Sequence, residues 1–377
     1  MTAQGVALLG STGSIGTTAL RVLSRHRDRF VVRALTAHGS AELLRAQAAE
    51  WQPSFVGLVQ GDGVADATWR RGPEALVEAA TRHDVEIVLN AVVGAAGLDA
   101  TMAALEAGKR VALANKESLV MGGALVKAAA QRGGGTLVPV DSEHSAILQC
   151  LAGRTTADIR RLVITASGGP FREWPAERVR AATAADALNH PTWSMGRKIS
   201  VDSATLANKA LEVIEAHFLF GLGYDQIDVV VHPQSIVHSM VEFRDGSVLA
   251  QLGVPSMELP ILYALSHPDR LEDGGVPAFD AVAAGPLTFE AVRYDAFPCL
   301  GLGVAAGRSG RAAPAVFNAA NEQAVMLFLE GKIALGAIAD SIAVALERHA
   351  GLAGDSREAL WDADAAARRT VREKCEC

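Results

Sequence analysis

The tripeptide Asp141-Ser142-Glu143 follows an apolar run, Thr136–Val140, that predicts a buried strand. Because residues two apart on an extended chain point the same way, both carboxylates would leave the strand end on one side. Ligands bind beyond the carboxyl ends of the strands in open parallel sheets, and paired carboxylates suit a hard divalent cation. The alternative is a helix start, with Asp141 or Ser142 as the cap and Glu143 in the first turn.

A second polar group lies farther along the chain and comprises Asp202, Ser203, Asn208, Lys209 and Glu212. Asp202 or Ser203 can cap a helix on which the other three side chains share one face. An amide, an ammonium and a carboxylate presented together suit a phosphorylated substrate held beside a metal. Glu212 would then be the third oxygen ligand, after Asp141 and Glu143. A solvated polar helix face is the alternative.

The segment Gly10–Gly16 (GSTGSIG) follows the first predicted strand and opens a predicted helix over 15–27. That context, with glycines at 10, 13 and 16, favours a turn that approaches a pyrophosphate at the helix N-terminus. After the second predicted strand, His38-Gly39-Ser40 offers no acidic residue for a ribose 2′-hydroxyl, which favours NADP over NAD. The segment also lacks an arginine or lysine for a 2′-phosphate, and His38 and Ser40 are its nearest polar candidates.

Three further loops carry side chains that could meet a substrate: Asn115, Lys116 and Glu117 after the fifth predicted strand, Ser167 before two glycines, and His190, Trp193 and Met195 in a third loop. The first group would lie beside the nicotinamide, although Asn115 could simply cap a helix. The loop after Ser167 binds an anion or only turns the chain. Trp193 and Met195 form either a lid over the substrate or a buried loop anchor.

Short β-branched runs alternate with helical patterns up to residue 140, which is typical of an α/β chain with a doubly wound parallel sheet. The strands are expected at 6–9, 31–35, 55–59, 86–92, 110–114 and 136–140. Later strands are expected at 161–166 and 227–231, with a hairpin of 236–243 and 248–252, and helices at 314–330, 333–350 and 357–372. We therefore predict a Rossmann-like domain over 1–141, a central α+β catalytic domain over 142–266, a linker over 267–297 and a C-terminal helical bundle over 298–377.

The composition indicates a soluble cytoplasmic protein whose partner is a small molecule. Hydrophobic residues make up 50% of the 377 and charged residues 20%, with no apolar run of roughly the 20 residues that a membrane span needs and no basic, apolar leader. Cysteines at 150, 299, 375 and 377 are too few for a disulfide scaffold, which fits a reducing compartment. A formal net charge of −7 without a basic stripe argues against nucleic acid.

Resemblance to a known family rests on six motifs in order: GSTGSIG, ANKESLV, PVDSEHSA, ASGGPFR, HPTWSMGRKISVDSATLANKALE and HPQSIVHSMVEF. They resemble the 1-deoxy-D-xylulose 5-phosphate reductoisomerases of the non-mevalonate isoprenoid pathway, over essentially the whole chain. The resemblance implies an oxidoreductase that rearranges 1-deoxy-D-xylulose 5-phosphate and reduces the branched aldehyde with NADPH to 2-C-methyl-D-erythritol 4-phosphate. It also implies a divalent metal, which can be magnesium, manganese or cobalt, and a homodimer.

The same resemblance assigns roles to individual residues. The metal ligands would be Asp141, Glu143 and Glu212; the phosphate contacts Ser167, Ser203, Asn208 and Lys209; and the groups around the reacting atoms Lys116, Ser142 and Glu143, with His190 also binding substrate. Lys116, Glu143 and His190 would be the catalytic residues, and Trp193 and Met195 the flap. The cofactor contacts would be Thr12, Gly13, Ser14, Ile15, Asn115, Glu117 and Gly196, with His38, Gly39 and Ser40 in place of the family's usual segment after the second strand.

Three other functions are compatible with parts of the sequence. A simple NADP-dependent dehydrogenase of a sugar phosphate would not need the three acidic residues. An aspartate-semialdehyde-type enzyme would need a nucleophilic cysteine, for which Cys150 in an apolar helix pattern is a poor candidate. A nucleotide sensor that had lost catalysis should have lost some of the charged site residues, and all of them are present.

Overall fold

The computed structural model describes residues 3–61 and 66–376, so Cys377 lies outside the described chain. The chain forms two compact units, of which the first comprises Met1–Ser118, Ala124–Ser145 and Ser256–Pro277. The second comprises Leu119–Gly123, Ala146–Pro255 and Ala278–Cys377. The predicted domains at 1–141, 142–266 and 298–377 divide the chain differently, and that division stays a prediction.

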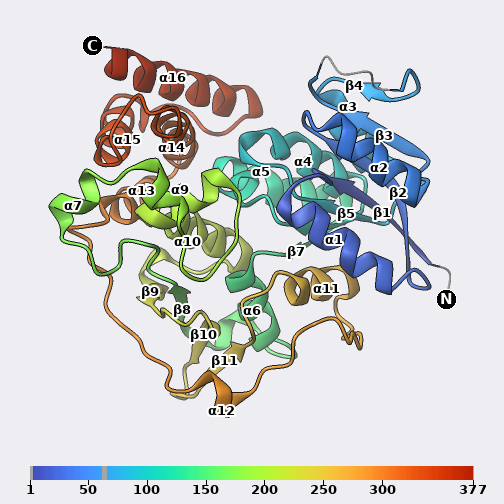
Figure 1. Ribbon diagram of the computed structural model, residues 1–377, viewed down its shortest axis with the longest axis horizontal. Helices are drawn as coiled ribbons and strands as arrows, with labels where there is room; N and C mark the ends of the chain where they lie inside the picture. The colour runs from blue at the N-terminus through green and yellow to red at the C-terminus, as the bar shows by residue number, and fades with distance from the viewer. Residues whose placement is uncertain (1–2, 62–65, 377) are drawn as a thin grey trace. The chain divides into compact units, whose positions relative to one another are not determined.

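A seven-stranded sheet forms the centre of the first unit, with the strand order β4-β3-β2-β1-β5-β6-β7 (Figure 1). The strands are β1 (Gln4–Leu9), β2 (Phe30–Ala37), β3 (Phe55–Leu58), β4 (Arg70–Arg71), β5 (Ile87–Asn90), β6 (Arg110–Leu113) and β7 (Thr136–Pro139). Every pairing between them is parallel, which confirms the predicted doubly wound sheet. Strand β4 was not predicted, because two residues are too few to show a pattern.

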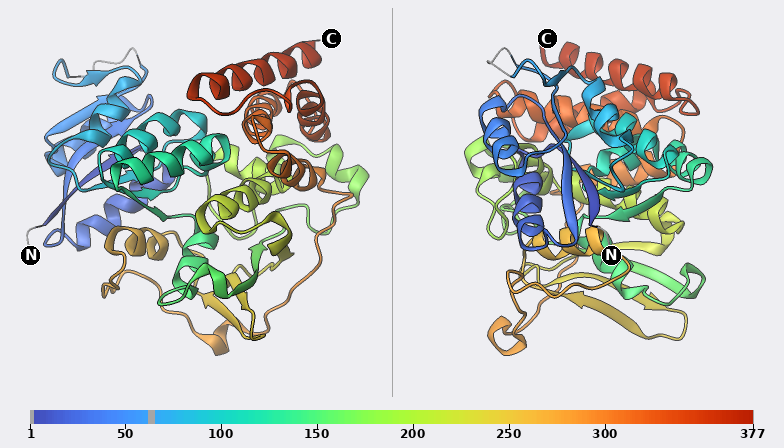
Figure 2. Two further views of the ribbon diagram at one scale, coloured as in Figure 1. Left: turned by 180° about the vertical axis from the view of Figure 1, so that it is seen from behind. Right: turned by 90° about the vertical axis from the view of Figure 1, so that its right-hand side faces the viewer.

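Helices cover both faces of this sheet. They are α1 (Ser14–Arg25), α2 (Ala41–Trp51), α3 (Glu74–Thr81), α4 (Leu98–Glu106) and α11 (Glu258–Ser266), with α5 (Lys116–Gly133) and α6 (Ser142–Cys150) beginning in this unit. Helices α1 and α11 pack together on one face, and α3 and α4 pack together on the other (Figure 2). This arrangement follows from right-handed crossovers that leave β1 in opposite directions along the sheet.

The segment Ser256–Pro277 is attached to α1 by charged contacts. Arg25 donates to Glu258 Oε2 and to Asp273 Oδ1, both at 2.7 Å, and His26 Nε2 lies 3.0 Å from Asp273 Oδ2. The first part of the predicted linker therefore packs against the first helix of the sheet.

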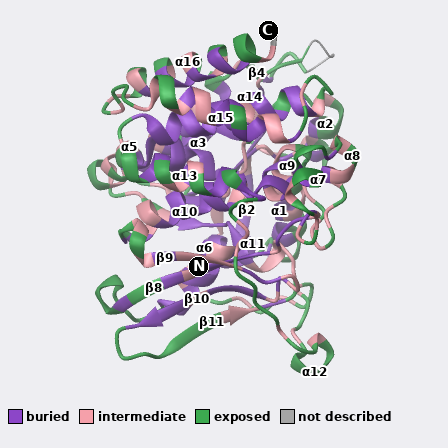
Figure 3. Cartoon of the chain, turned by 90° about the vertical axis from the view of Figure 1, so that its left-hand side faces the viewer, coloured by how far each residue is buried: buried purple, intermediate pink, exposed green. Residues whose placement is uncertain are grey.

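The second unit contains a four-stranded sheet with the order β11-β10-β8-β9. The strands β8 (Ile159–Ala166) and β9 (Ile227–Val231) are parallel, whereas β10 (Val237–Phe243) pairs antiparallel with β8 and with β11 (Val248–Leu252). The predicted hairpin around Asp245-Gly246 is confirmed, and Gly246 has a φ of 87° in the turn. The first three residues of the edge strand β11 are exposed (Figure 3).

The α-helices that lie wholly within the second unit are α7 (Ala176–Arg180), α8 (Ala184–Leu188), α9 (Arg197–Thr205), α10 (Ala207–Phe220), α12 (Ala281–Ala284), α13 (Pro298–Ser309), α14 (Ala313–Leu329), α15 (Gly336–His349) and α16 (Arg357–Glu376). The three predicted C-terminal helices correspond to α14, α15 and α16, which pack on one another (Figure 2). Helix α13 was missed because its sequence, PCLGLGVAAGRS, is rich in glycine. Among the described helices, none has the length and hydropathy needed to cross a bilayer.

Gly16 lies where α1 packs closely against the backbone of the turn before it, and a substitution there tests this packing. A Cβ at Gly16 would lie 2.3 Å from the carbonyl oxygen of Gly10 and 2.6 Å from the backbone of Ser11, whereas a Cβ at Gly13 would lie 3.5 Å from the Gly10 oxygen. Because backbone must shift, Gly16→Ala should lower the free energy of unfolding by about 1–3 kcal/mol. Gly13→Ala is the control, and equal melting temperatures for the two variants would contradict this account.

Candidate active site

The carboxylate of Asp141 is buried beyond the carboxyl end of β7, beside an ammonium group and an imidazole. Lys116, at the start of α5, forms an ion pair with it, and His144 Nδ1 lies 3.6 Å from Asp141 Oδ1. Burial would raise the pKa of the Asp141 carboxyl, but Lys116 and then His144 hold that pKa well below its usual range. The carboxylate is therefore ionised at neutral pH.

The tripeptide around Asp141 begins a helix, as the alternative expectation proposed. Strand β7 ends at Pro139, and α6 begins at Ser142, so the predicted extended geometry is wrong. Asp141 instead makes contacts typical of a helix start. Its Oδ1 accepts the N–H of Glu143 at 3.4 Å, and its carbonyl accepts the N–H of Ser145 at 2.8 Å. Glu143 still approaches Asp141, and Ser142 Oγ donates to Glu143 Oε2 at 2.5 Å.

Asn115 fixes the start of α5 to the loop after β5. It occupies the N-cap position, but its side chain makes no cap hydrogen bond, which excludes the alternative that Asn115 simply caps the helix. The Asn115 amide instead donates to the carbonyls of Val92 and Gly94, each at 2.8 Å, and to Glu117 Oε2 at 3.0 Å. The hydrogen bonds of Asn115 therefore fix the start of α5, and with it Lys116 and Glu117, against the loop that follows β5.

Asn90 is a supporting residue that sequence reasoning missed. It ends β5, and its amide donates to the Gly97 carbonyl at 3.0 Å and to Thr101 Oγ1 at 2.8 Å, while its oxygen accepts the N–H of Val92 at 3.1 Å. The available signal was an asparagine at the end of the apolar run Ile87–Leu89. A buried amide in that position must find partners, and here it finds them in the loop that Asn115 also holds.

The glycine-rich turn has the geometry expected for a pyrophosphate. Gly10 has a φ of 82°, and the N–H groups of Gly10 and Ser11 both donate to the Thr36 carbonyl, at 3.0 and 2.8 Å. Gly13 is the N-cap of α1, and no side chain makes a cap hydrogen bond there. Thr12, Ser14 and Ile15 surround this start, and the predicted segment His38–Ser40 is exposed immediately after β2.

His190 connects the loop after β8 with the predicted flap. Its Nδ1 accepts the N–H groups of Thr192 and Trp193 at 3.1 and 2.9 Å, so its proton is on Nε2, which lies 3.0 Å from Ser167 Oγ. Burial lowers the pKa of His190, which keeps the ring neutral at pH 7. His190 therefore donates to Ser167 while it holds the first residues of the flap.

The flap itself is intermediate between the two predicted alternatives. Trp193 and Met195 are half-buried, and the Trp193 ring lies 6.3 Å from the His238 ring. Gly196 follows as the exposed N-cap of α9. The flap is therefore neither fully solvated nor a buried anchor.

Ser167 and Ser203 belong to segments that pack together. Gly168 and Gly169 have φ angles of 83° and 66°, and they turn the chain after Ser167. A Cβ at Gly169 would lie 2.9 Å from the carbonyl oxygen of Ser203, so only glycine allows this approach. The loop after β8 thus brings a hydroxyl and several amides close to α9.

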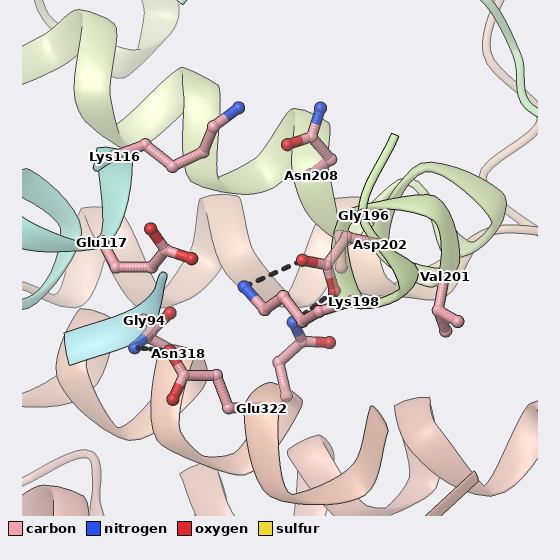
Figure 4. Close-up of polar contacts among 12 residues, drawn as sticks. Gly94, Lys116, Glu117, Gly196, Lys198, Val201, Asp202, Asn208, Asn318 and Glu322 are labelled. Carbon is pink, nitrogen blue, oxygen red and sulfur yellow. Dashed lines mark hydrogen bonds and ion pairs between the residues drawn. The ribbon is translucent and has the colours of Figure 1, made fainter. Parts of the chain in front are cut away.

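Asp202 lies inside α9 and does not cap the following helix, so the predicted cap at Asp202 or Ser203 is wrong. Leu206, with a φ of 56°, separates α9 from α10. The buried Asp202 carboxylate accepts from Lys198 Nζ at 2.9 Å (Figure 4) and from Asn321 Nδ2 of α14 at 2.8 Å. These contacts explain the burial, because a carboxylate in the core requires charged or amide partners.

The predicted polar face of α10 exists, but it is buried. Asn208 Nδ2 donates to Glu212 Oε1 at 2.5 Å, and Lys209 forms an ion pair with Glu212. Lys209 and Glu212 are only 3% and 1% exposed, which excludes the alternative of a solvated helix face. A buried ammonium and carboxylate are costly to desolvate, so their presence here favours a ligand-binding role.

Comparisons with known proteins agree with this geometry. The family model for 1-deoxy-D-xylulose 5-phosphate reductoisomerase matches residues 6–123, and models of two C-terminal domains of these proteins match residues 137–220 and 252–370. A reductoisomerase of Synechocystis sp. is 50% identical and is aligned over 99% of this chain and 98% of its own. One of Rippkaea orientalis is 49% identical over 97% and 95%.

Solved structures give the same result. A DOX-P reductoisomerase in complex with NADPH, fosmidomycin and magnesium has a TM-score of 0.94 at 41% identity and covers 99% of this chain and 98% of its own. The Zymomonas mobilis reductoisomerase in complex with NADPH has a TM-score of 0.91 at 40% identity and covers 99% of both chains.

A double-mutant cycle tests the Lys198–Asp202 pair. Lys198→Met leaves a buried carboxylate without its cation and should lower the free energy of unfolding by about 3–5 kcal/mol. Asp202→Asn should cost less, because Lys198 can turn toward solvent. The double variant should be more stable than Lys198→Met alone, since it no longer buries an unpaired charge.

Urea unfolding of the three variants measures the cycle. Arg180→Met is the control, because Arg180 pairs with Asp340 at the surface and its loss should cost about 1 kcal/mol or less. Additive losses in the double variant would contradict the pairing.

Proposed function

The chain belongs to the 1-deoxy-D-xylulose 5-phosphate reductoisomerase family, and we propose that the residues described above divide the work of that family's reaction. The chain is an NADP-dependent oxidoreductase that converts 1-deoxy-D-xylulose 5-phosphate to 2-C-methyl-D-erythritol 4-phosphate, with a divalent metal. The observation that carries the division of roles is the ionised, buried Asp141 beside Glu143 and Lys116, at the carboxyl edge of the parallel sheet. Solved relatives were obtained with NADPH and magnesium, which agrees with both cofactors.

The metal would be held by Asp141, Glu143 and Glu212. These are oxygen ligands, the set that magnesium, manganese and cobalt accept, and the low pKa of Asp141 supports the choice because a ligand must be deprotonated. The burial of Glu212 in contact with an amide and an ammonium supports a role for it in the same site. When bound, the metal polarises the keto group and stabilises the charge that develops on the neighbouring oxygens.

The cofactor would lie along the carboxyl edge of the first sheet. The open start of α1 and the approach that Gly16 permits suit a pyrophosphate contacted by Thr12, Gly13, Ser14 and Ile15. Asn115, Glu117 and Gly196 are the proposed contacts toward the nicotinamide, and His38, Gly39 and Ser40 those toward the adenine ribose. NADPH supplies the hydride for the reduction.

The substrate phosphate would be held by Ser167, Ser203, Asn208 and Lys209. Lys209 provides the positive charge, and the serine hydroxyls and amide provide directed hydrogen bonds. Lys116, Ser142 and Glu143 would surround the keto and hydroxyl groups, where Lys116 donates to a developing oxyanion and Glu143 exchanges a proton. A neutral His190 can orient the substrate while it keeps the flap in place, and Trp193 and Met195 would exclude water from the aldehyde.

The competing functions have less support. Cys150 is buried, so it does not offer the accessible thiol that an aspartate-semialdehyde-type reaction requires. A sensor or a simple dehydrogenase would have no use for the buried charged groups at Asp141, Lys209 and Glu212.

We further propose a cytoplasmic homodimer that works in isoprenoid precursor synthesis. The edge strand β11 exposes Val248 and Leu249 together with its unpaired backbone groups, which suits pairing with a second copy. The free cysteines Cys150, Cys299 and Cys375 suit a reducing compartment.

Removal of the metal tests both the reaction and the ligand set. Chelator-treated protein should consume no NADPH in the presence of the substrate, and magnesium should restore the activity. Asp141→Asn and Glu212→Gln should not be restored, although both should bind NADPH nearly as well as the unaltered protein does. Asp84→Asn is the matched control, because Asp84 pairs with Arg82 away from this site. Full activity of either ligand variant under limiting metal would reject the three-carboxylate site.

Lys209→Ala tests the phosphate contact. Loss of a charged hydrogen bond should raise KM for the sugar phosphate by about 10- to 100-fold, with a smaller effect on kcat. Lys332→Ala is the control, because Lys332 forms an exposed pair with Glu330. An unchanged KM in steady-state kinetics would reject the role of Lys209.

A further inference from the structure

We propose that Arg71 supplies the cation that binds the 2′-phosphate of NADPH in this chain. The inference rests on the proposed function, because it takes NADPH as the cofactor. Arg71 lies outside the segment His38–Ser40, and we expect Arg71 to distinguish NADPH from NADH. The residue types of that segment provide a hydroxyl and an imidazole but no permanent positive charge.

The sheet register places Arg71 at the correct edge. Ala37 of β2 faces Leu58 of β3, and Leu58 faces Arg71 of β4. The three strands therefore end at one level, and the segment that follows β2 is the one that meets the adenine ribose in dinucleotide-binding sheets. Arg71 ends a strand two positions away from β2, at the same carboxyl edge (Figure 1).

Backbone contacts bring the Arg71 side chain toward this segment. The N–H of Gln60 donates to the His38 carbonyl at 2.6 Å, and a Cβ at Gly61 would lie 3.6 Å from the Gly39 carbonyl oxygen, so Gly61 lies against Gly39. Arg71 Nη1 donates to the Gly61 carbonyl at 3.0 Å. The guanidinium thus reaches the residue that touches Gly39, and its five N–H groups allow it to hold a carbonyl and a phosphate together.

Arginine is the side chain best suited to this role. Its guanidinium is always charged at physiological pH, and its planar fork binds two phosphate oxygens at once. Ser40 precedes α2 as its N-cap residue and its side chain makes no cap hydrogen bond, so its hydroxyl can add a second contact to the phosphate.

Two other arginines, Arg45 and Arg70, lie near Arg71 but make different contacts. Arg45 of α2 lies over the Trp69 ring, with its guanidinium carbon 6.0 Å from the ring centroid. Arg70 points to the other face, where its Nε lies 2.8 Å from Glu78 of α3. Arg70 is therefore a matched control: it is the adjacent residue, has the same charge and lies on the same strand, but is directed away from the cofactor.

Equilibrium binding of NADPH and NADH to Arg71→Gln and Arg70→Gln tests the proposal without relying on turnover. Arg71→Gln should weaken NADPH binding by about 10- to 100-fold, because a charge-assisted contact to phosphate is lost, and should change NADH binding by less than about twofold. Arg70→Gln should leave both affinities unchanged. Arg71→Lys should recover part of the loss, since it restores the charge without the fork.

Two results would overturn the proposal: unchanged NADPH affinity in Arg71→Gln, or an equal loss for NADPH and NADH. Melting temperatures of the variants show whether each has folded, and 2′,5′-ADP can replace NADPH as a probe that carries the phosphate but no nicotinamide. Unaltered protein that binds neither NADPH nor 2′,5′-ADP would instead reject NADP as the cofactor, which is a failure of the proposed function itself.

Discussion

The buried ion pair between Lys116 and Asp141 is the interaction on which the rest of the first unit depends. A buried charge that loses its partner costs about 3–5 kcal/mol, so both residues must stay together. Leu113 of β6 faces Pro139 of β7, and the helices that follow these strands begin at Lys116 and Ser142. The pair therefore sits where two parallel strands end, and it keeps a carboxylate ionised there. Glu143 belongs to the same helix start and is placed by the same constraint.

The second unit buries charge in a comparable way. Lys209 and Glu212 form a pair within α10. Asp202 of α9 forms an ion pair with Lys198 (Figure 4) and accepts a hydrogen bond from Asn321. Groups of this kind do not improve a hydrophobic core, and their concentration beside a glycine-rich loop is better explained by ligand binding than by stability. His190 adds a neutral donor whose tautomer is set by the backbone of the flap. Each unit therefore buries an ion pair between a lysine and a carboxylate.

Much of the fold follows from local pattern, whereas the site depends on contacts that local pattern does not contain. Alternating apolar runs predicted the parallel sheet, and motif order indicated the family. The cap at Asp202 was wrong because its partner, Asn321, lies far along the chain. The solvated face of α10 was excluded by packing that helical periodicity does not show. Arg71 was missed for a related reason: a two-residue strand has no periodicity, and only the register with β3 brings it to the cofactor edge.

The identity of the product tests the central claim most directly, because buried acidic groups beside a dinucleotide fold have a clear purpose only if rearrangement accompanies reduction. The protein would be incubated with 1-deoxy-D-xylulose 5-phosphate, NADPH and magnesium, and the product identified by NMR. The expected product is the branched 2-C-methyl-D-erythritol 4-phosphate. A linear sugar alcohol phosphate, formed by reduction of the keto group alone, would contradict it.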